Sequence, residues 1–205
     1  MIKIFSGADR TRFSQDFDQM FRARAAVFKD RLGWEVAVED GLEIDRYDRC
    51  DDTVYVVASD ADGHLTGSLR LLPTTGDTML RYEFADFFDE PVDVESPTAW
   101  ECTRFCVHPP RRGERAEAMR QVSSDLLIGL CDLCLTSGIE HIVGLYDARM
   151  TRIYQRIGWT PDLLAESHSA RGHLVVGLWE ATPRALERMQ ALSVRSRTLP
   201  LRQAA

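Results

Sequence analysis

The pattern of apolar and polar positions along the chain predicts strands mixed with helices. Short apolar or alternating runs indicate strands at 2–5, 53–60, 64–72, 98–107, 141–146 and 172–181. Runs with the 3.6-residue period indicate helices at 10–32, 79–88, 114–137, 148–157 and 183–195. A DADG turn joins the second and third strands into a hairpin. We therefore expect an α/β sandwich around a mixed sheet.

Length and polarity set the domain organisation. With 205 residues, the chain can bury one sizeable core, so we expect a single domain over 1–195 and a loose basic tail over 196–205. No apolar stretch reaches the ~18 residues that cross a membrane. The start, MIKIFSGADR, lacks the apolar run of a secretion signal, so we expect a cytoplasmic protein.

Charge and cysteine content narrow the function classes. A net charge of −7 argues against broad nucleic-acid binding, which needs a basic face, but is compatible with a local basic patch. In a cytoplasmic protein the five cysteines should be reduced. Cys131 and Cys134 form a C-x-x-C within an apolar helical run and have no evident second ligand pair. We favour core packing for them and expect no metal site.

Several charged residues stand in apolar surroundings. Arg24 falls within the apolar arc of the first predicted helix, where it could extend from a core edge or bind a carboxylate in a pocket. Arg70 belongs to the polar face of HLTGSLRLL, which could be a solvated sheet face or the wall of a cleft. Glu101 and Arg104, in WECTRF, would point to opposite faces of a regular strand. They could serve one site only if the strand bulges or splays.

The polar segment 33–52 offers acids that could pair with these arginines. It contains LEIDRYDRCDD, which lacks the glycine and glutamate positions of a calcium-binding EF-hand loop. One interpretation is a solvated acidic loop. The other is that Asp45 and Asp48 join the arginines in one buried network, with less support for Glu43. Trp34 and Phe28 could form an aromatic wall or belong to the core.

Other catalytic motifs are missing from the sequence. There is no G-x-G-x-x-G, no Walker loop and no G-x-S-x-G, and Ser167, His168 and His173 make no convincing hydrolase set.

Four segments together resemble a known family. FRARAAVFKDRLGW, the E-I-D-x-Y-D loop, GSLRLLPTTGDTML and WECTRFCV are similar to the LuxI-type acyl-homoserine-lactone synthases, the autoinducer synthases of quorum sensing, from about residue 20 to 108. The resemblance implies a GNAT-like three-layer α/β/α sandwich around a mixed, mostly antiparallel sheet. It also implies a functional set, which contains every misplaced charge above: Arg24, Phe28, Trp34, Asp45, Asp48, Arg70, Phe84, Glu101 and Arg104.

The resemblance implies two reactions. The amine of S-adenosylmethionine attacks an acyl thioester, and the substrate carboxylate then closes the lactone and expels methylthioadenosine. S-adenosylmethionine is thus a substrate, and no cofactor is expected. Glu101 is the candidate base, Arg104 acts beside it, and a backbone N–H near Phe105 to Val107 is the candidate oxyanion donor.

The acyl donor stays open between acyl carrier protein and coenzyme A, since PPRRGERA fits the GNAT coenzyme-A loop poorly. An acidic carrier would need a local basic patch, and the candidates are Arg111, Arg112, Arg115, Arg149, Arg152 and Arg156, which could equally be solvated helix faces. The expected acyl pocket comprises Leu126, Leu127, Leu130, Val143, Gly144, Leu145 and Met150. Gly144 occupies a position where family members making 3-oxo products often have threonine, which hints at an unsubstituted acyl chain.

Two alternatives remain at this point. One is an N-acyltransferase of the same fold that acts on another amine. The other is a non-catalytic binding module in which the buried charges are structural.

Overall fold

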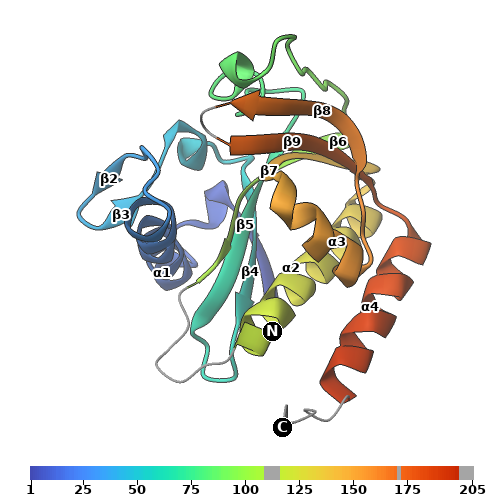
Figure 1. Ribbon diagram of the computed structural model, residues 1–205. Helices are drawn as coiled ribbons and strands as arrows, with labels where there is room; N and C mark the ends of the chain where they lie inside the picture. Colours follow the sequence, from blue (N-terminus) through green and yellow to red (C-terminus); the bar gives the residue numbers. More distant parts are fainter. Residues whose placement is uncertain (109–115, 170–171, 199–205) are drawn as a thin grey trace, which may run out of the picture.

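The computed structural model describes residues 1–108, 116–169 and 172–198, and it contains one large sheet (Figure 1). Seven strands lie in the order β1-β4-β5-β6-β7-β9-β8. Their bounds are Ile2–Ser6 (β1), Val54–Ser59 (β4), Leu65–Pro73 (β5), Ala99–Val107 (β6), His141–Asp147 (β7), Asp162–Ser169 (β8) and Gly172–Glu180 (β9). All neighbouring strands are antiparallel except β6 and β7, which are parallel. The predicted mixed, mostly antiparallel sheet is confirmed.

Helices cover both faces of the sheet. On one face lies α1 (Ser14–Arg24), and on the other lie α2 (Ala116–Ser137), α3 (Thr151–Ile157) and α4 (Pro183–Thr198) (Figure 1). The sequence of strand β4 is apolar at nearly every position because both faces of the strand are buried. Tyr55 and Val57 pack with α1, whereas Val56 and Ala58 pack with α2. A strand that is buried on both faces cannot show the polar alternation of a half-exposed strand.

Three predicted elements differ from the structure, and one strand was not predicted. The first helix begins at Ser14 and continues as a π-helix over Ala25–Arg31. Residues 79–88 form turns and a 3-10 helix at Ala85–Phe87 rather than a regular helix. Strand β8 was not predicted, because its Leu163 and Leu164 are exposed at the sheet edge and give no core-facing alternation. Helix α4 extends to Thr198, into the expected tail.

The predicted loop at 33–52 contains regular structure. Val38–Glu39 (β2) and Leu42–Glu43 (β3) form a small hairpin. Asp40 and Gly41 connect the two strands with φ of 52° and 79°. Asp-Gly with positive φ at both positions is the usual two-residue hairpin turn, so the sequence did contain a signal for this hairpin. A 3-10 helix at Arg46–Arg49 follows.

The β6 strand has two irregularities that shape the site. It pairs with β7 only over Ala99–Glu101. Beyond Glu101, β6 still pairs with β5 and β7 still pairs with β9, but β6 and β7 separate from each other. In the pairing with β5, Ser68 faces Cys106 while Arg70 faces Thr103, so one β5 residue opposes two β6 residues. Arg104, at this bulge, has a φ of 50°. Both the splay and the bulge that the charge pattern required are therefore present.

Among the described residues, no helix has the length and apolar character needed to cross a bilayer.

Candidate functional site

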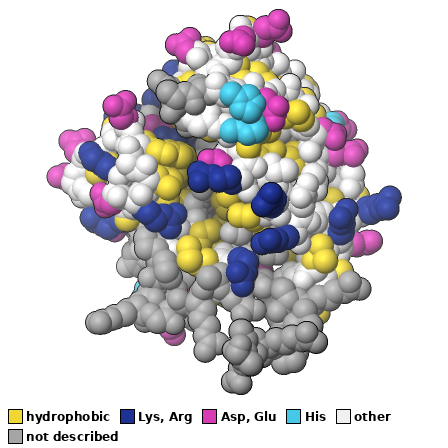
Figure 2. All heavy atoms as spheres, viewed as in Figure 1, with side chains coloured by type: hydrophobic (Ala, Val, Ile, Leu, Met, Phe, Trp, Pro, Cys, Tyr) yellow, Lys and Arg dark blue, Asp and Glu magenta, His cyan; other side chains and the backbone are white. Residues whose placement is uncertain are grey.

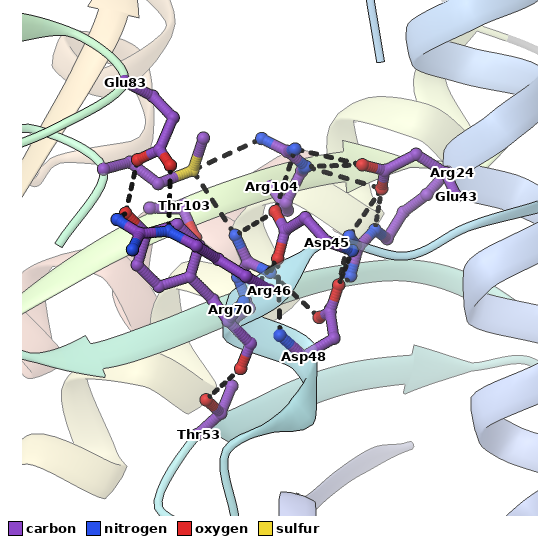
Figure 3. A network of polar contacts seen from close by, with 12 residues as sticks. Arg24, Glu43, Asp45, Arg46, Asp48, Thr53, Arg70, Glu83, Thr103 and Arg104 are labelled. Atoms are coloured by element: carbon purple, nitrogen blue, oxygen red, sulfur yellow. Dashed lines mark hydrogen bonds and ion pairs between the residues drawn. The ribbon is translucent and has the colours of Figure 1, made fainter. Parts of the chain in front are cut away.

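Three arginines and three carboxylates converge in one buried network (Figure 3). Arg24 donates from Nη1 and Nη2 to the two carboxylate oxygens of Asp48, both at 2.9 Å. Its Nε donates to Glu43 Oε2 at 2.5 Å. The paired, planar geometry of arginine and carboxylate makes these hydrogen bonds strong and directional. All three nitrogen atoms of the Arg24 guanidinium therefore donate to carboxylates, and its side chain is only 1% exposed.

Arg70 joins the other side of the same network. Its Nη1 and Nη2 donate to Asp45 at 2.5 and 2.8 Å, and Nη1 also lies 2.9 Å from Asp48 Oδ1. Its Nε donates to Thr103 Oγ1 at 3.0 Å. Asp48 thus lies between two guanidinium groups. Although burial alone would raise its pKa, the charges of Arg24 and Arg70 hold the pKa of Asp48 far below its ordinary value.

Arg104 forms the open edge of the network. It contacts Glu43 at 3.0 Å and Asp45 at 3.0 Å through Nη2, and its Nη1 has a sulfur partner, Met79 Sδ, at 3.3 Å. A thioether is a weak acceptor. The side chains of Arg104 and Asp45 are 9% and 20% exposed, while those of Arg24, Arg70 and Asp48 are at most 1% exposed. An incoming charged group would therefore meet Arg104 and Asp45.

The D-x-Y-D sequence explains how the acids are held. Asp45 is the N-cap of the 3-10 helix at Arg46–Arg49, where it accepts from the backbone N–H groups of Tyr47 and Asp48. Asp48 Oδ2 accepts in return from the N–H of Asp45 at 2.9 Å. This reciprocal capping box fixes both carboxylates at a three-residue spacing. Of the two interpretations of this segment, the structure shows the one in which Asp45 and Asp48 pair with the arginines.

Glu43 is a full member of the network rather than a peripheral one. It is 1% exposed and bridges Arg24 and Arg104. Its position depends on the β2–β3 hairpin, which places Leu42–Glu43 beside α1. With Glu43 included, three positive charges meet three negative charges, and this balance makes burial tolerable.

Glu101 lies next to this network at the point where β6 and β7 separate. It pairs with Val143, the last matched pair of the two strands. Its oxygens accept from the backbone N–H groups of Met79 at 2.7 Å and Leu80 at 3.0 Å. Burial raises the pKa of Glu101 to about 7, although the two backbone hydrogen bonds lower it. A carboxylate with such a pKa can exchange a proton near neutral pH.

The bulge brings Arg104 to the face of Glu101. Arg104 Nη1 and Arg70 Nη2 both lie 3.3 Å from the sulfur of Met79, whose N–H holds Glu101. In an unbroken strand, side chains three residues apart would lie on opposite faces. The left-handed backbone at Arg104 removes that conflict.

A second set of contacts fastens the Met79 turn to the Asp45–Asp48 segment. Tyr47 Oη donates to the carbonyl of Thr78 at 2.9 Å and also contacts the carboxylate of Glu83. Arg46 donates to Tyr47 Oη at 2.8 Å and to Glu83 at 3.1 Å. These contacts between residues 46–47 and 78–83 are called the Tyr47 latch below.

The aromatic candidates lie at different depths. Phe28 is buried and stacks on Trp34 with ring centroids 5.0 Å apart, and Arg104 lies 5.5 Å from the Phe28 ring. Trp34 is 51% exposed, so it is not a core residue. Phe84 packs against Tyr47 and Met79, next to the turn that holds Glu101. All three flank the network, as the functional interpretation requires.

The predicted acyl-pocket residues lie on two different faces of the sheet. Leu126, Leu127, Leu130 and Met150 belong to the α2-side core, whereas Val143 and Leu145 pack with Leu80 on the face of Glu101. The three α2 leucines are packed core residues. The seven residues therefore do not share one face of the sheet, and which of them contact an acyl chain stays a prediction. Phe105 packs on the α2 side, and Val107 is half-buried.

Gly144 lies just past Val143, the last residue of β7 that pairs with β6. A Cβ there would come 3.1 Å from the carbonyl oxygen of Cys102 and 3.6 Å from the Trp179 ring. A larger residue would thus press on the β6 backbone near the point where the two strands separate.

The proposed carrier surface is only partly described. Arg111, Arg112 and Arg115 lie outside the described residues. Arg149 is exposed and paired with Asp147 at 2.6 Å, and Arg152 and Arg156 are exposed on α3. Figure 2 shows the surface hollowed between the side of α1 and the side of β8–β9, with Lys and Arg side chains around the hollow. That this region docks an acyl carrier stays a prediction.

Sequence reasoning missed Met79, Thr103 and the Tyr47 latch. Met79 lies in GDTML, and only its fold-dependent position between two arginines reveals its role. Tyr47 stands in the D-x-Y-D motif, which was the available signal for it.

Comparison with known proteins identifies similar chains. A family model described as autoinducer synthase matches residues 9–186. An acyl-homoserine-lactone synthase of Rhizobium etli is 60% identical over 166 residues, covering 81% of this chain and 77% of that protein. One of Ralstonia nicotianae is 35% identical over 76% of this chain and 77% of that protein.

Solved structures show the same fold. A CoA-dependent acyl-homoserine lactone synthase, BjaI, with SAM and isopentyl-CoA has a TM-score of 0.80 at 24% identity, covering 98% of this chain and 91% of that chain. The structure of TofI with an inhibitor and MTA has a TM-score of 0.69 at 30% identity, covering 87% of this chain and 93% of that chain. An acyl-CoA N-acyltransferase from Pseudomonas aeruginosa has a TM-score of 0.58 at 16% identity, covering 87% of this chain and 98% of that chain, so the shared fold is GNAT-like.

Proposed function

The chain belongs to the autoinducer synthase family, and we propose that the buried network and the β6–β7 splay form its reaction site. The reaction makes an acyl-homoserine lactone from S-adenosylmethionine and an acyl donor. The observation that carries this proposal is the convergence of Glu101, Arg104 and Asp45 at the point where the two parallel strands separate. Binding of a zwitterionic substrate needs both charges at an accessible edge, and Arg104 with Asp45 supplies them.

The arginines have separate roles in this proposal. Arg104 receives the substrate carboxylate, because its Nη1 has only a thioether partner among its described contacts. Arg24 and Arg70 are saturated by Asp48, Glu43 and Asp45, so they position the acids and do not bind substrate. Trp34, which is half-exposed, covers the adenine or the sulfonium through its ring face, and the buried Phe28 supports Trp34 by stacking on it.

Acyl transfer begins with the substrate amine. An α-amino group is largely protonated near pH 7, so a base must take its proton before it attacks the thioester carbonyl. Glu101, directly or through one water, accepts that proton. A backbone N–H between Phe105 and Val107, just beyond the bulge, donates to the oxyanion. The C–N bond forms, the C–S bond of the thioester breaks, and the carrier thiol leaves with a proton.

Lactone closure needs little further chemistry. The carboxylate oxygen attacks the γ-carbon, the C–S bond to the sulfonium breaks, and neutral methylthioadenosine leaves. Because the sulfonium is already a good leaving group, Arg104 contributes mainly by holding the carboxylate in line.

Mass spectrometry tests the proposed chemistry. The protein is incubated with S-adenosylmethionine and a panel of acyl thioesters on coenzyme A and on acyl carrier protein, and lactone and methylthioadenosine are measured. We expect both products from at least one donor. If no donor releases methylthioadenosine, the proposed chemistry is wrong, and an acyltransferase that acts on another amine becomes the better interpretation.

Glu101→Gln tests the role of the base. We expect acyl transfer to fall by about 10² or more while S-adenosylmethionine binding stays within a few fold. In the wild type the carboxylate is protonated below about pH 7, so acyl transfer should decline as pH falls through that value. The variant should lack this component of the profile. Full activity in Glu101→Gln, or an unchanged pH profile, would remove Glu101 from the mechanism.

A further inference from the structure

Two histidines and a glutamate lie close together on one face of the β8–β9 hairpin. The proposed synthase reaction does not use these residues. His168 and His173 are directly opposite each other in the strand register, and Glu166 is two residues before His168 on the same face. The imidazole rings stack with centroids 4.0 Å apart, and His173 Nε2 lies 3.0 Å from Glu166 Oε1. Figure 2 shows a pair of adjacent His side chains beside an acidic one on this face.

We propose that Glu166, His168 and His173 form a binding site for a divalent transition-metal ion, with Zn²⁺ as the best match to the donor set. Two imidazoles and a carboxylate are the three protein ligands of many open zinc sites, in which water takes the fourth position. One ligand atom from each residue lies within 4.8 Å of the other two. Tetrahedral coordination at about 2.1 Å needs ligand atoms about 3.4 Å apart, so modest side-chain rotation completes the geometry.

The backbone supports this geometry. All three residues are on paired strands rather than on a loop, so their Cα positions are fixed by the ladder. The facing histidines can approach one ion only because they occupy the same register position. All three side chains are exposed, so an ion can reach them from solvent.

A second group of possible metal ligands on the molecule is a weaker candidate for a metal site. Asp60, Asp62 and His64 also lie close together. There Asp60 Oδ1 already accepts from the backbone N–H groups of Asp62 and His64 at 3.0 and 2.9 Å, as expected of a turn carboxylate. This group supplies one imidazole instead of two, and it provides a matched control.

The position of the site gives the ion a structural consequence. A bound ion would cross-link β8, which is the edge strand, to β9 near the end of the hairpin. The opposite face of the same hairpin contributes Ala165 and Val176 to the apolar cluster with Leu80 and Val143, beside Glu101. The ion would therefore stiffen one wall near the reaction site without contacting substrate.

Isothermal titration of the tag-free protein with Zn²⁺, and separately with Ni²⁺, tests the site without measuring turnover. We expect one equivalent to bind in the wild type, and a rise in Tm on Zn²⁺ addition. His168→Ala and His173→Ala should each weaken binding at least tenfold, and Glu166→Gln should weaken it less. His64→Ala should leave it unchanged.

Cys50→Ser serves as a further control, because Cys50 is an exposed thiol that could bind Zn²⁺. The proposal is overturned if no ion binds, if His168→Ala/His173→Ala binds as the wild type does, or if Cys50→Ser removes the binding. These outcomes are independent of whether the protein makes a lactone.

Discussion

At the scale of single residues, Asp48 is the side chain on which two buried arginines depend. It receives two hydrogen bonds from Arg24 and contacts Arg70 at 2.9 Å, and Tyr55 Oη donates to it at 2.8 Å. It is fully buried. Removing one partner of a buried ionic network costs far more than the network contributes as a whole, because the remaining charges stay desolvated.

Asp48→Asn should therefore lower the free energy of unfolding by about 3–5 kcal/mol. Urea denaturation at pH 7 measures this. Asp18→Asn is the control, because Asp18 makes an exposed pair with Arg22 and should change stability by less than about 1 kcal/mol. A loss of under 1 kcal/mol in Asp48→Asn would contradict the network.

The lowered pKa of Asp48 gives the same prediction a pH dependence. The native carboxyl stays ionised below its ordinary pKa of 3.8, whereas in the unfolded chain it takes up a proton near that value. Its stabilisation is complete above pH 3.8 and is lost as pH falls further. The acid limb of the wild-type stability curve should thus be steeper than that of Asp48→Asn.

At the scale of elements, the site depends on how two irregular segments are held together. The segment 45–49 positions Asp45 and Asp48, and the turn around Met79 positions Glu101 through two backbone N–H groups. The Tyr47 latch connects them. The ring of Tyr47 is buried against Leu72 and Met79, so its hydroxyl is held at a fixed point.

Tyr47→Phe should keep the packing and remove the latch hydroxyl. We expect a stability loss of about 1 kcal/mol. Because small displacements of catalytic groups are costly, we also expect a fall in kcat of about tenfold, with little change in KM for S-adenosylmethionine. Steady-state kinetics and urea denaturation measure both.

Tyr82→Phe is the matched control for the latch. Tyr82 lies in the same turn, is half-exposed, and stacks on Arg46 through its ring, which phenylalanine retains. Equal kinetic loss in the two variants would show that the Tyr47 hydroxyl has no special part in positioning Glu101.

At the scale of the whole molecule, charge distribution matters for the acyl donor. The chain carries a net charge of −7, so an acidic carrier protein would be repelled on average. The exposed Arg152 and Arg156 on α3 could overcome this locally. Attraction between exposed charges is screened by salt, with a Debye length of about 8 Å at physiological ionic strength.

Arg152→Glu/Arg156→Glu should raise KM for an acyl carrier protein donor by about tenfold, through a slower association. KM for S-adenosylmethionine should not change. The wild-type KM for the carrier should also rise with added salt. Arg188→Glu, an exposed substitution on α4, is the control. If only acyl-CoA supports turnover, or if both charge reversals behave alike, the docking proposal is wrong.

The sequence by itself determined most of the elements and most of the charged residues of the site. The β4–β5 hairpin, β6, α2 and β9 follow from local periodicity, which a chain expresses within a few residues. Arg24, Arg70, Glu101 and Arg104 were recognisable because charges in apolar runs need partners. These signals depend on residues that are close in the sequence, so they can be recognised without knowledge of the tertiary structure.

The tertiary structure alone decided which of these residues meet. Glu43 became a network member through a hairpin packed on α1, and Arg104 turned to the face of Glu101 through a one-residue bulge. The predicted acyl residues fell on two faces because Val143 and Leu145 lie on the face of Glu101, whereas the α2 leucines cover the other face. In a strand, a shift of one residue moves every following side chain to the other face. Strand register depends on distant pairing, so periodicity could identify these residues but could not assign their partners.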